Sequence, residues 1–196
     1  MRFKLVKETL YESLENTFKP KREDEIINLL SKLSKDELNN KFLDASEKGL
    51  INNVQYFIKA GADVNAKDTD GWTALLFASC DGLEQLVKIL IKSGADVNIK
   101  SKRGWTALHM ASAKGHTSII KLLLKAGVDI NAKTIEGHTA LYLSSFNDQE
   151  QIVKILIKSG ADLNIKDNEG CTALHDALFF GCEAMAKLLK SYGAKE

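Results

Sequence analysis

Apolar residues along the chain form short groups, separated by polar turns that contain glycine. In one group the apolar positions recur at the three- and four-residue spacing of a helix with one buried face: Leu83, Leu86, Val87, Leu90 and Ile91. A shorter apolar segment precedes it, beginning after Thr73, a good N-cap, and ending at Gly82, which suits the left-handed residue after a helix. The pattern predicts two short antiparallel helices and a turn, a unit that must stack on neighbours to bury its apolar surface.

The same unit recurs at a spacing of 33 residues. Two glycine series and one asparagine series keep that spacing: Gly61, Gly94, Gly127, Gly160 and Gly193; Gly71, Gly104, Gly137 and Gly170; Asn65, Asn98, Asn131 and Asn164. Four copies also begin with Gly-x-Thr-Ala-Leu, at residues 71–75, 104–108, 137–141 and 170–174. A strict period in this range predicts a stacked repeat architecture. The asparagines are interpreted as residues that satisfy backbone groups of the turns.

These residues resemble the ankyrin repeat. The family's Thr-Pro-Leu-His signature is similar to Thr106-Ala107-Leu108-His109 and Thr172-Ala173-Leu174-His175, and residues 87–98 resemble its second helix and the turn after it. The resemblance covers about residues 37–194. It implies an all-α fold, an ankyrin-repeat solenoid of about five stacked helix-turn-helix repeats with projecting turns, plus an N-terminal helical cap.

The chain departs from the family pattern in three ways. Alanine replaces the usual proline in all four motifs, and Leu76 and Tyr142 replace the signature histidine in two of them. We expect those two repeats to lack the loop hydrogen bonds that the family's histidine makes. Asp148 stands where a glycine usually separates the two helices, so Asn147 or Asp148 must adopt a left-handed conformation.

The period divides the chain into six segments: an N-terminal helical extension or cap (1–35), a degenerate repeat (36–69), three full repeats (70–102, 103–135 and 136–168) and a C-terminal capping repeat (169–196). Ser34 and Glu37 form a predicted capping box at the start of the degenerate repeat. Residues 22–33 predict a helix with Ile26, Leu30 and Leu33 on one face, which we expect to pack on the first repeat. Residues 10–18 are weakly amphipathic, and the whole extension could instead be a docking or self-association arm.

Composition limits the kinds of partner and the cellular compartment that we expect for this protein. A net charge of +1 gives no reason to expect nucleic acid or an anionic membrane as the main partner. No apolar run approaches the length of a bilayer span, and no apolar stretch follows the N-terminus as in a secretory signal. Three cysteines fit reduced thiols better than a disulfide framework. We therefore expect a cytoplasmic protein, with delivery into a host cell left open.

The sequence carries no recognisable catalytic set, so we predict a protein that is not an enzyme and needs no cofactor. Cys80 has no evident basic partner that would make it a nucleophile. A zinc site of Cys171, His175 and Cys182 was considered. We expect no metal there, because Cys171 lies in a projecting turn, Cys182 opens the second helix, and His175 is expected to bond within its own loop.

The resemblance also predicts where a partner would bind, because partners of the family usually contact the projecting turns and first helices. Positions that differ between copies on these elements are the candidate partner-binding residues: Asp70, Trp72, Cys80, Lys102, Arg103, Trp105, Glu136, His138, Phe146, Phe179 and Phe180. Trp72 and Trp105 occupy equivalent positions, so we expect them on one surface. They could form a binding hot spot, or they could rigidify the turns on which they lie.

Three functions remain open at this point. The leading hypothesis is a protein-interaction module, an adaptor, inhibitor or effector whose partner protein is unidentified, present as a monomer or weakly self-associated. The second is a structural protein that self-associates through Phe179, Phe180 and the N-terminal arm. The third, a nucleic-acid binder using the Lys100–Arg103 turn and Trp105, is disfavoured because Asp68, Asp70 and Glu169 occupy matching turns.

Overall fold

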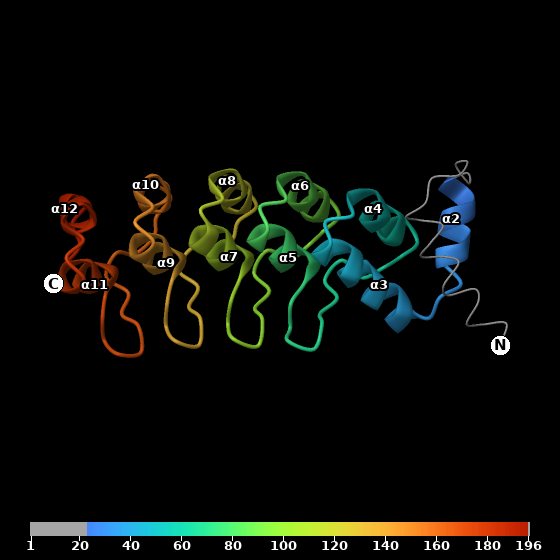
Figure 1. The fold of residues 1–196 in the computed structure, drawn as a ribbon, viewed down its shortest axis with the longest axis horizontal. Coiled ribbons are helices and arrows are strands. Elements are labelled where there is room, and N and C mark those ends of the chain that lie inside the picture. Colours follow the sequence, from blue (N-terminus) through green and yellow to red (C-terminus); the bar gives the residue numbers. More distant parts are fainter. Residues whose placement is uncertain (1–22, 196) are drawn as a thin grey trace. The chain divides into compact units, whose positions relative to one another are not determined.

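A computed structural model describes residues 23–195, and within this range the regular elements are α-helices without any strand (Figure 1). The chain divides into two compact units, Met1–Asp63 and Val64–Glu196. The first contains α2 (Glu23–Leu30), α3 (Lys35–Glu47) and α4 (Ile51–Lys59). The second contains α5 (Ala74–Cys80), α6 (Glu84–Lys92), α7 (Ala107–Lys114), α8 (Thr117–Lys125), α9 (Ala140–Phe146), α10 (Glu150–Lys158), α11 (Ala173–Phe179) and α12 (Glu183–Ser191). The all-helical fold confirms the predicted class. The amphipathic segment at residues 10–18 lies outside the described residues.

In the first unit, both α2 and α3 pack against α4, as expected of a cap on a helix pair. Phe42, Val54 and Leu30 are buried between them. The predicted capping box is confirmed, since Ser34 Oγ accepts the Glu37 backbone N–H at 3.3 Å and the Glu37 side chain returns to Ser34.

The prediction that the first helix continues to Leu33 is wrong. Helix α2 ends at Leu30, and Leu33 lies half-buried in the turn that follows. Ser34 must be extended to cap α3, with φ −61° and ψ 157°, so the chain has to leave the helical conformation before that residue.

In the second unit, four helix pairs stack in register. The inner helices α5, α7, α9 and α11 pack successively on one another, and the outer helices α6, α8, α10 and α12 each pair with the inner helix before them (Figure 1). The turns that precede the inner helices project together from one edge of this stack. Leu75, Leu108, Leu141 and Leu174, one from each motif, are almost completely buried. The repeated leucine therefore forms the core.

The inner helices begin as the sequence predicts. Thr73, Thr106, Thr139 and Thr172 each accept the backbone N–H three residues ahead. The connection between the two helices of a repeat uses a left-handed residue, Gly82 in the first pair of this unit (φ 74°). In the third pair Asp148 takes that role with φ 53°, which confirms the expected left-handed conformation at this position.

Backbone hydrogen bonds tie each projecting turn to the next. The N–H of Lys102 donates to Asp70 O at 2.9 Å, that of Ile135 to Arg103 O at 3.1 Å and that of Asn168 to Glu136 O at 3.1 Å. Gly104 is required here for two reasons: its φ is +76°, and a Cβ would lie 2.8 Å from Ile135 N. The spacing between turns thus depends on the repeated glycine.

The repeated asparagines form a second ladder, between the turns that follow the outer helices. The Oδ1 atoms of Asn65, Asn98, Asn131 and Asn164 each accept the backbone N–H 31 residues ahead, at distances of 2.7–2.9 Å. This confirms that the asparagines serve the backbone of the turns. Both ladders help to hold the stack together.

Candidate protein-binding face

Two hollows lie along the inner helices and projecting turns of the second unit. The first, the tryptophan hollow, encloses about 520 Å³ and is lined by Trp72, Ser101, Arg103, Trp105, Met110, Ala113, Lys114, Leu143, Phe146 and Asn147. The second, the acidic hollow, encloses about 590 Å³ and is lined by Glu136, His138, Tyr142, Phe146, Asp167, Asn168, Glu169, Cys171, His175, Asp176, Phe179 and Phe180. Phe146 belongs to both. Together they make one continuous face, here called the inner face.

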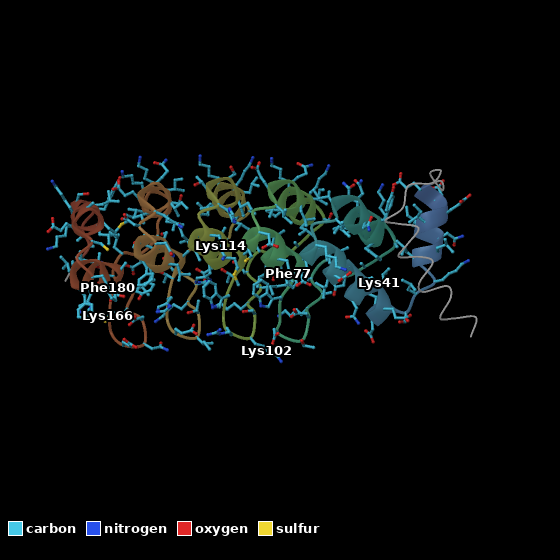
Figure 2. All side chains as sticks on the ribbon, in the orientation of Figure 1. Lys41, Phe77, Lys102, Lys114, Lys166 and Phe180 are labelled. Carbon is cyan, nitrogen blue, oxygen red and sulfur yellow. The ribbon has the colours of Figure 1, made fainter. Side chains whose placement is uncertain are left out.

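The inner face contains eight of the eleven predicted binding residues. Asp70, Cys80 and Lys102 line neither hollow. Asp70 and Lys102 are exposed. Lys102 lies in a projecting turn, whereas Lys114 and Phe180 lie beside the inner helices (Figure 2). Cys80 is half-buried, and burial is the main cause of the raised pKa of its thiol. That thiol is poorly suited to act as a nucleophile.

In the tryptophan hollow, Trp72 and Trp105 lie on one surface, and each is half-buried. Their backbone N–H groups are held by Asp68 Oδ1 at 2.7 Å and Ser101 Oγ at 3.2 Å. The Trp72 ring packs on its own inner helix, with its centroid 5.0 Å from that of Phe77. Both tryptophans are therefore placed in fixed positions with part of the indole open to solvent.

The rim of the tryptophan hollow is basic. Lys114 is exposed, and the side chain of Arg103 is 74% exposed even though its guanidinium lies 3.2 Å from Glu136 Oε1. An exposed ion pair of this kind contributes little to stability. Arg103 therefore remains available to a partner's carboxylate.

In the acidic hollow, six aromatic rings form a continuous cluster. His138 stacks on Tyr142 with centroids 4.2 Å apart, Tyr142 on Phe146 at 6.4 Å, and Phe146 meets the edge of Phe180 at 5.9 Å. Phe180 contacts Phe179, which stacks on His175. Phe146, Phe179 and Phe180 are 59%, 76% and 61% exposed, so the half of this cluster that consists of phenylalanines faces solvent, as does the ring of His175.

Four carboxylates surround that cluster: Glu136, Asp167, Glu169 and Asp176. Asp167 is nearly buried and organises the last projecting turn, because its Oδ1 accepts the N–H groups of Glu169 and Cys171, each at 2.9 Å. Asp176 Oδ2 accepts the hydroxyl of Tyr142. Partial burial first, and then the Asp176 carboxylate, raise the pKa of the Tyr142 phenol, so the hydroxyl keeps its proton and donates it.

Sequence reasoning overlooked Tyr142 and Asp176 as site residues. The sequence pattern shows Tyr142 only as a replacement for the signature histidine, whereas its hydroxyl donates a hydrogen bond to Asp176 in the next repeat. The position of Asp176 holds Phe77, Met110 and Leu143 in the other copies. An acidic residue at an otherwise apolar position was the signal that could have identified it.

The two signature histidines lie in different environments. His109 is buried: its Nδ1 accepts the Thr106 N–H at 3.1 Å, and its Nε2 faces Ala132 O at 3.0 Å and His138 O at 3.1 Å. Burial lowers the pKa of His109 to about 4. The expectation that His175 bonds within its own loop is wrong, because its ring is exposed. The carbonyls that hold His109 belong to the following turn, and the described residues contain no such turn after His175.

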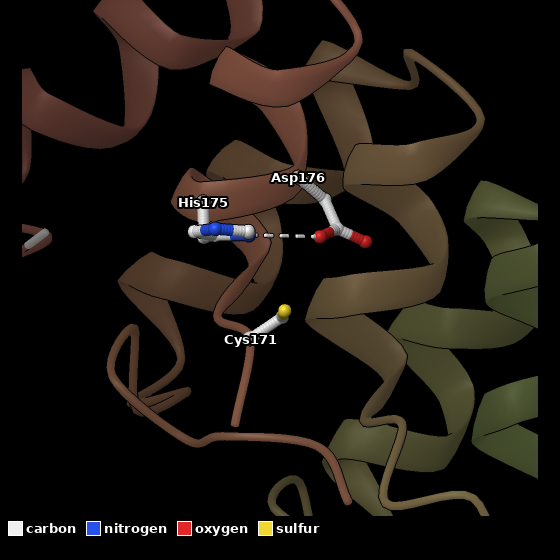
Figure 3. Close-up of side chains that lie close together, drawn as sticks. All are labelled: Cys171, His175 and Asp176. Carbon is white, nitrogen blue, oxygen red and sulfur yellow. Dashed lines mark hydrogen bonds and ion pairs between the residues drawn. The ribbon is translucent and has the colours of Figure 1, made fainter. Parts of the chain in front are cut away.

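The exposed His175 lies within a group that could hold a metal ion. Cys171 Sγ, a ring nitrogen of His175 and a carboxylate oxygen of Asp176 all lie within 4.8 Å of one another (Figure 3). Cys182, which was considered with Cys171 and His175 from the sequence, is not part of this group.

Comparison with known families identifies the repeat. A model described as ankyrin repeats, three copies, matches residues 42–134 and again residues 129–196. None of the curated proteins matches the chain. Across residues 23–195, each helix is too short or too polar to cross a membrane. The two matches together cover most of the sequence, and the helix pairs, threonine caps and turn ladders are those of a stacked repeat. The chain belongs to the ankyrin-repeat family.

Proposed function

We propose that this chain binds a partner protein through the inner face, as an adaptor, an inhibitor or an effector. Ankyrin repeats are in general protein-interaction modules, and the family is typically non-enzymatic. The observation that carries the proposal is the exposed half of the aromatic cluster, Phe146, Phe179 and Phe180. Aromatic side chains dominate binding hot spots, and a contiguous exposed group of them typically marks an interaction surface.

The scaffold does not require these aromatics. Counting back by one, two and three repeats from Phe179 gives Phe146, Ala113 and Cys80, and from Phe180 gives Asn147, Lys114 and Asp81. The same inner helix forms with each of these residues at its end. The presence of phenylalanine at these solvent-exposed positions is therefore better explained by binding than by folding.

The charges of the two hollows differ in sign, which favours one orientation of a bound partner over the reverse one. The rim of the tryptophan hollow carries Arg103 and Lys114, whereas the acidic hollow carries Glu136, Asp167 and Glu169. Opposite charges across an interface fix its register and exclude wrong partners. We propose a partner segment with apolar anchors, an acidic group that meets Arg103 and a basic group that meets the acidic hollow.

A photo-cross-linking experiment tests the proposal. A photoreactive phenylalanine analogue at position 179 should capture a discrete protein from an extract of the producing or host cells, whereas the same analogue at Lys125, exposed on an outer helix, should not. Trp72→Ala with Trp105→Ala should abolish capture, while Lys92→Ala with Lys158→Ala should leave it intact. Equal capture from positions 179 and 125 would contradict a specific inner face.

Self-association is the second candidate, and one observation favours it: Phe179 and Phe180, the two most exposed phenylalanines of residues 23–195, are adjacent. Light scattering over a concentration series distinguishes it, because a self-associating chain gains mass with concentration and Phe179→Asp would reverse the gain. The nucleic-acid alternative has less support. Asp68, Asp70 and Glu169 occupy the matching turns, and Lys100 Nζ donates to Lys133 O at 3.3 Å, so one cation of that turn is already engaged.

We also propose that the chain acts in the cytoplasm. This rests on the thiols of Cys80, Cys171 and Cys182, which are all free. Free thiols persist in a reducing compartment.

A further inference from the structure

We propose that Cys171, His175 and Asp176 bind a divalent transition-metal ion of the zinc type, at a site that opens onto the acidic hollow. Thiolate sulfur, imidazole nitrogen and carboxylate oxygen are the three ligand types that zinc takes in proteins. The inference is independent of the proposed partner protein, because it rests only on side chains of this chain.

Comparison of the repeats shows that the scaffold does not explain this group. Cys171 corresponds to Trp72, Trp105 and His138; His175 to Leu76, His109 and Tyr142; and Asp176 to Phe77, Met110 and Leu143. In the first three copies the three positions never carry a set of metal ligands. His138 and His109 are single ligand types in separate copies, and only the last copy carries a ligand type at all three positions.

The separations suit a tetrahedral ion. His175 Nδ1 and Asp176 Oδ1 are 3.3 Å apart, and two ligands on a tetrahedral zinc at about 2.0 Å each are separated by about 3.3 Å. Cys171 Sγ lies within 4.8 Å of a ring nitrogen of His175 and of a carboxylate oxygen of Asp176 (Figure 3). A sulfur–nitrogen separation of about 3.5 Å on zinc then requires the turn that carries Cys171 to shift by at most about 1.3 Å.

Each ligand is held in place by a neighbour. Tyr142 donates its hydroxyl to Asp176 Oδ2, which leaves Oδ1 directed at His175. Asp167 Oδ1 holds the backbone N–H of Cys171 at 2.9 Å, and the His175 ring stacks on Phe179. Such outer contacts orient ligands and commonly change metal affinity by about 10-fold or more.

The electrostatic surroundings favour a cation. Three carboxylates, those of Asp167, Glu169 and Asp176, line the acidic hollow together with Cys171. A divalent ion would relieve the repulsion among these groups and stabilise the thiolate. His175 is exposed and the hollow is open, so the fourth position faces solvent or a partner's side chain.

Cobalt(II) titration of the reduced full-length chain tests the site, because cobalt bound to a thiolate shows a near-ultraviolet charge-transfer band and tetrahedral cobalt shows intense visible bands. The expected result is saturation at one cobalt per chain, reversed by zinc. Cys171→Ser should remove the charge-transfer band, His175→Ala and Asp176→Asn should weaken binding at least 10-fold, and Tyr142→Phe should weaken it about 10-fold without changing the spectrum.

The matched controls are Cys182→Ser and Cys80→Ser, which remove thiols outside the group and should leave both spectrum and affinity unchanged. Circular dichroism of every variant checks that the repeat stays folded. No charge-transfer band in the wild type, a band that persists in Cys171→Ser, or a band lost in Cys182→Ser would each overturn the proposal.

Discussion

The second full motif and the last motif of the chain share the residues Thr-Ala-Leu-His, yet they have different surroundings. In the repeat of α7, Gly104 and His109 contact the following turn, and Met110 is buried. In the repeat of α11, a Cβ on Gly170 would meet nothing within 4 Å, and His175 faces solvent. A repeated residue therefore has its structural role only where the next repeat contacts it. In a repeat that no following turn contacts, the same residue type can serve another function.

The largest expected contrast is between the two glycines. Gly104→Ala should destabilise the fold by about 3–4 kcal/mol, because a Cβ would lie 2.8 Å from Ile135 N and the residue has a φ of +76°. Gly170→Ala should lower the free energy of unfolding by only about 1 kcal/mol. The space around Gly170 is open, so the only penalty is that of placing alanine at a φ of +86°. Urea unfolding measures both. Equal losses of stability in the two variants would contradict the role of the backbone hydrogen bonds between neighbouring projecting turns.

The two histidines give the next contrast. At pH 7, His109→Leu should cost about 2–3 kcal/mol, because it leaves the Thr106 N–H and the two carbonyls without their partner. Leucine fits the position sterically, as the buried Leu76 shows one repeat earlier. His175→Leu should change the free energy of unfolding by less than about 0.5 kcal/mol. A large loss from His175→Leu would show that His175 is structural.

The cost of His109→Leu should also depend on pH. The pKa of His109 falls from 6.5 to about 4 on folding, so below pH 6.5 the unfolded chain takes up a proton that the folded chain refuses. The stability due to neutral His109 is complete above pH 6.5 and is lost as the pH falls toward 4. At pH 5 the difference between wild type and His109→Leu should therefore shrink by about 2 kcal/mol. A difference that stays constant from pH 7 to pH 5 would argue against a buried neutral imidazole.

The smallest effect on stability is expected at the aromatic cluster. Phe179→Ala and Phe180→Ala should each change the free energy of unfolding by about 0.5 kcal/mol or less, because both rings are mostly exposed. Leu174→Ala, in the same helix but buried, should cost about 2–5 kcal/mol and serves as the control. Similar losses at Phe179 and Leu174 would mean that the aromatics belong to the core.

Local rules predicted most of the fold. The period gave the paired helices, Thr73 and its equivalents cap as expected, Ser34 and Glu37 form their box, and Asp148 takes the left-handed conformation. One failure depended on a contact between distant residues, and the other on the cap of the neighbouring helix. Whether a signature histidine is buried depends on a turn about 25 residues later, and the fate of Leu33 depended on the cap of the next helix. For the candidate site, Trp72, Trp105 and the phenylalanines could be chosen by comparing copies, but the bond between Tyr142 and Asp176 spans 34 residues and needed the structure.

The central claim is that repeated residues make the fold and the variable inner face binds a partner. Its most direct test is the dissociation constant of the captured partner for Phe179→Ala with Phe180→Ala, measured by calorimetry alongside the free energy of unfolding of the same variant. We predict binding weaker by about 30-fold or more, equivalent to about 2 kcal/mol, with the free energy of unfolding changed by about 1 kcal/mol or less. Unchanged affinity, or a loss of affinity explained by an equal loss of stability, would contradict the claim.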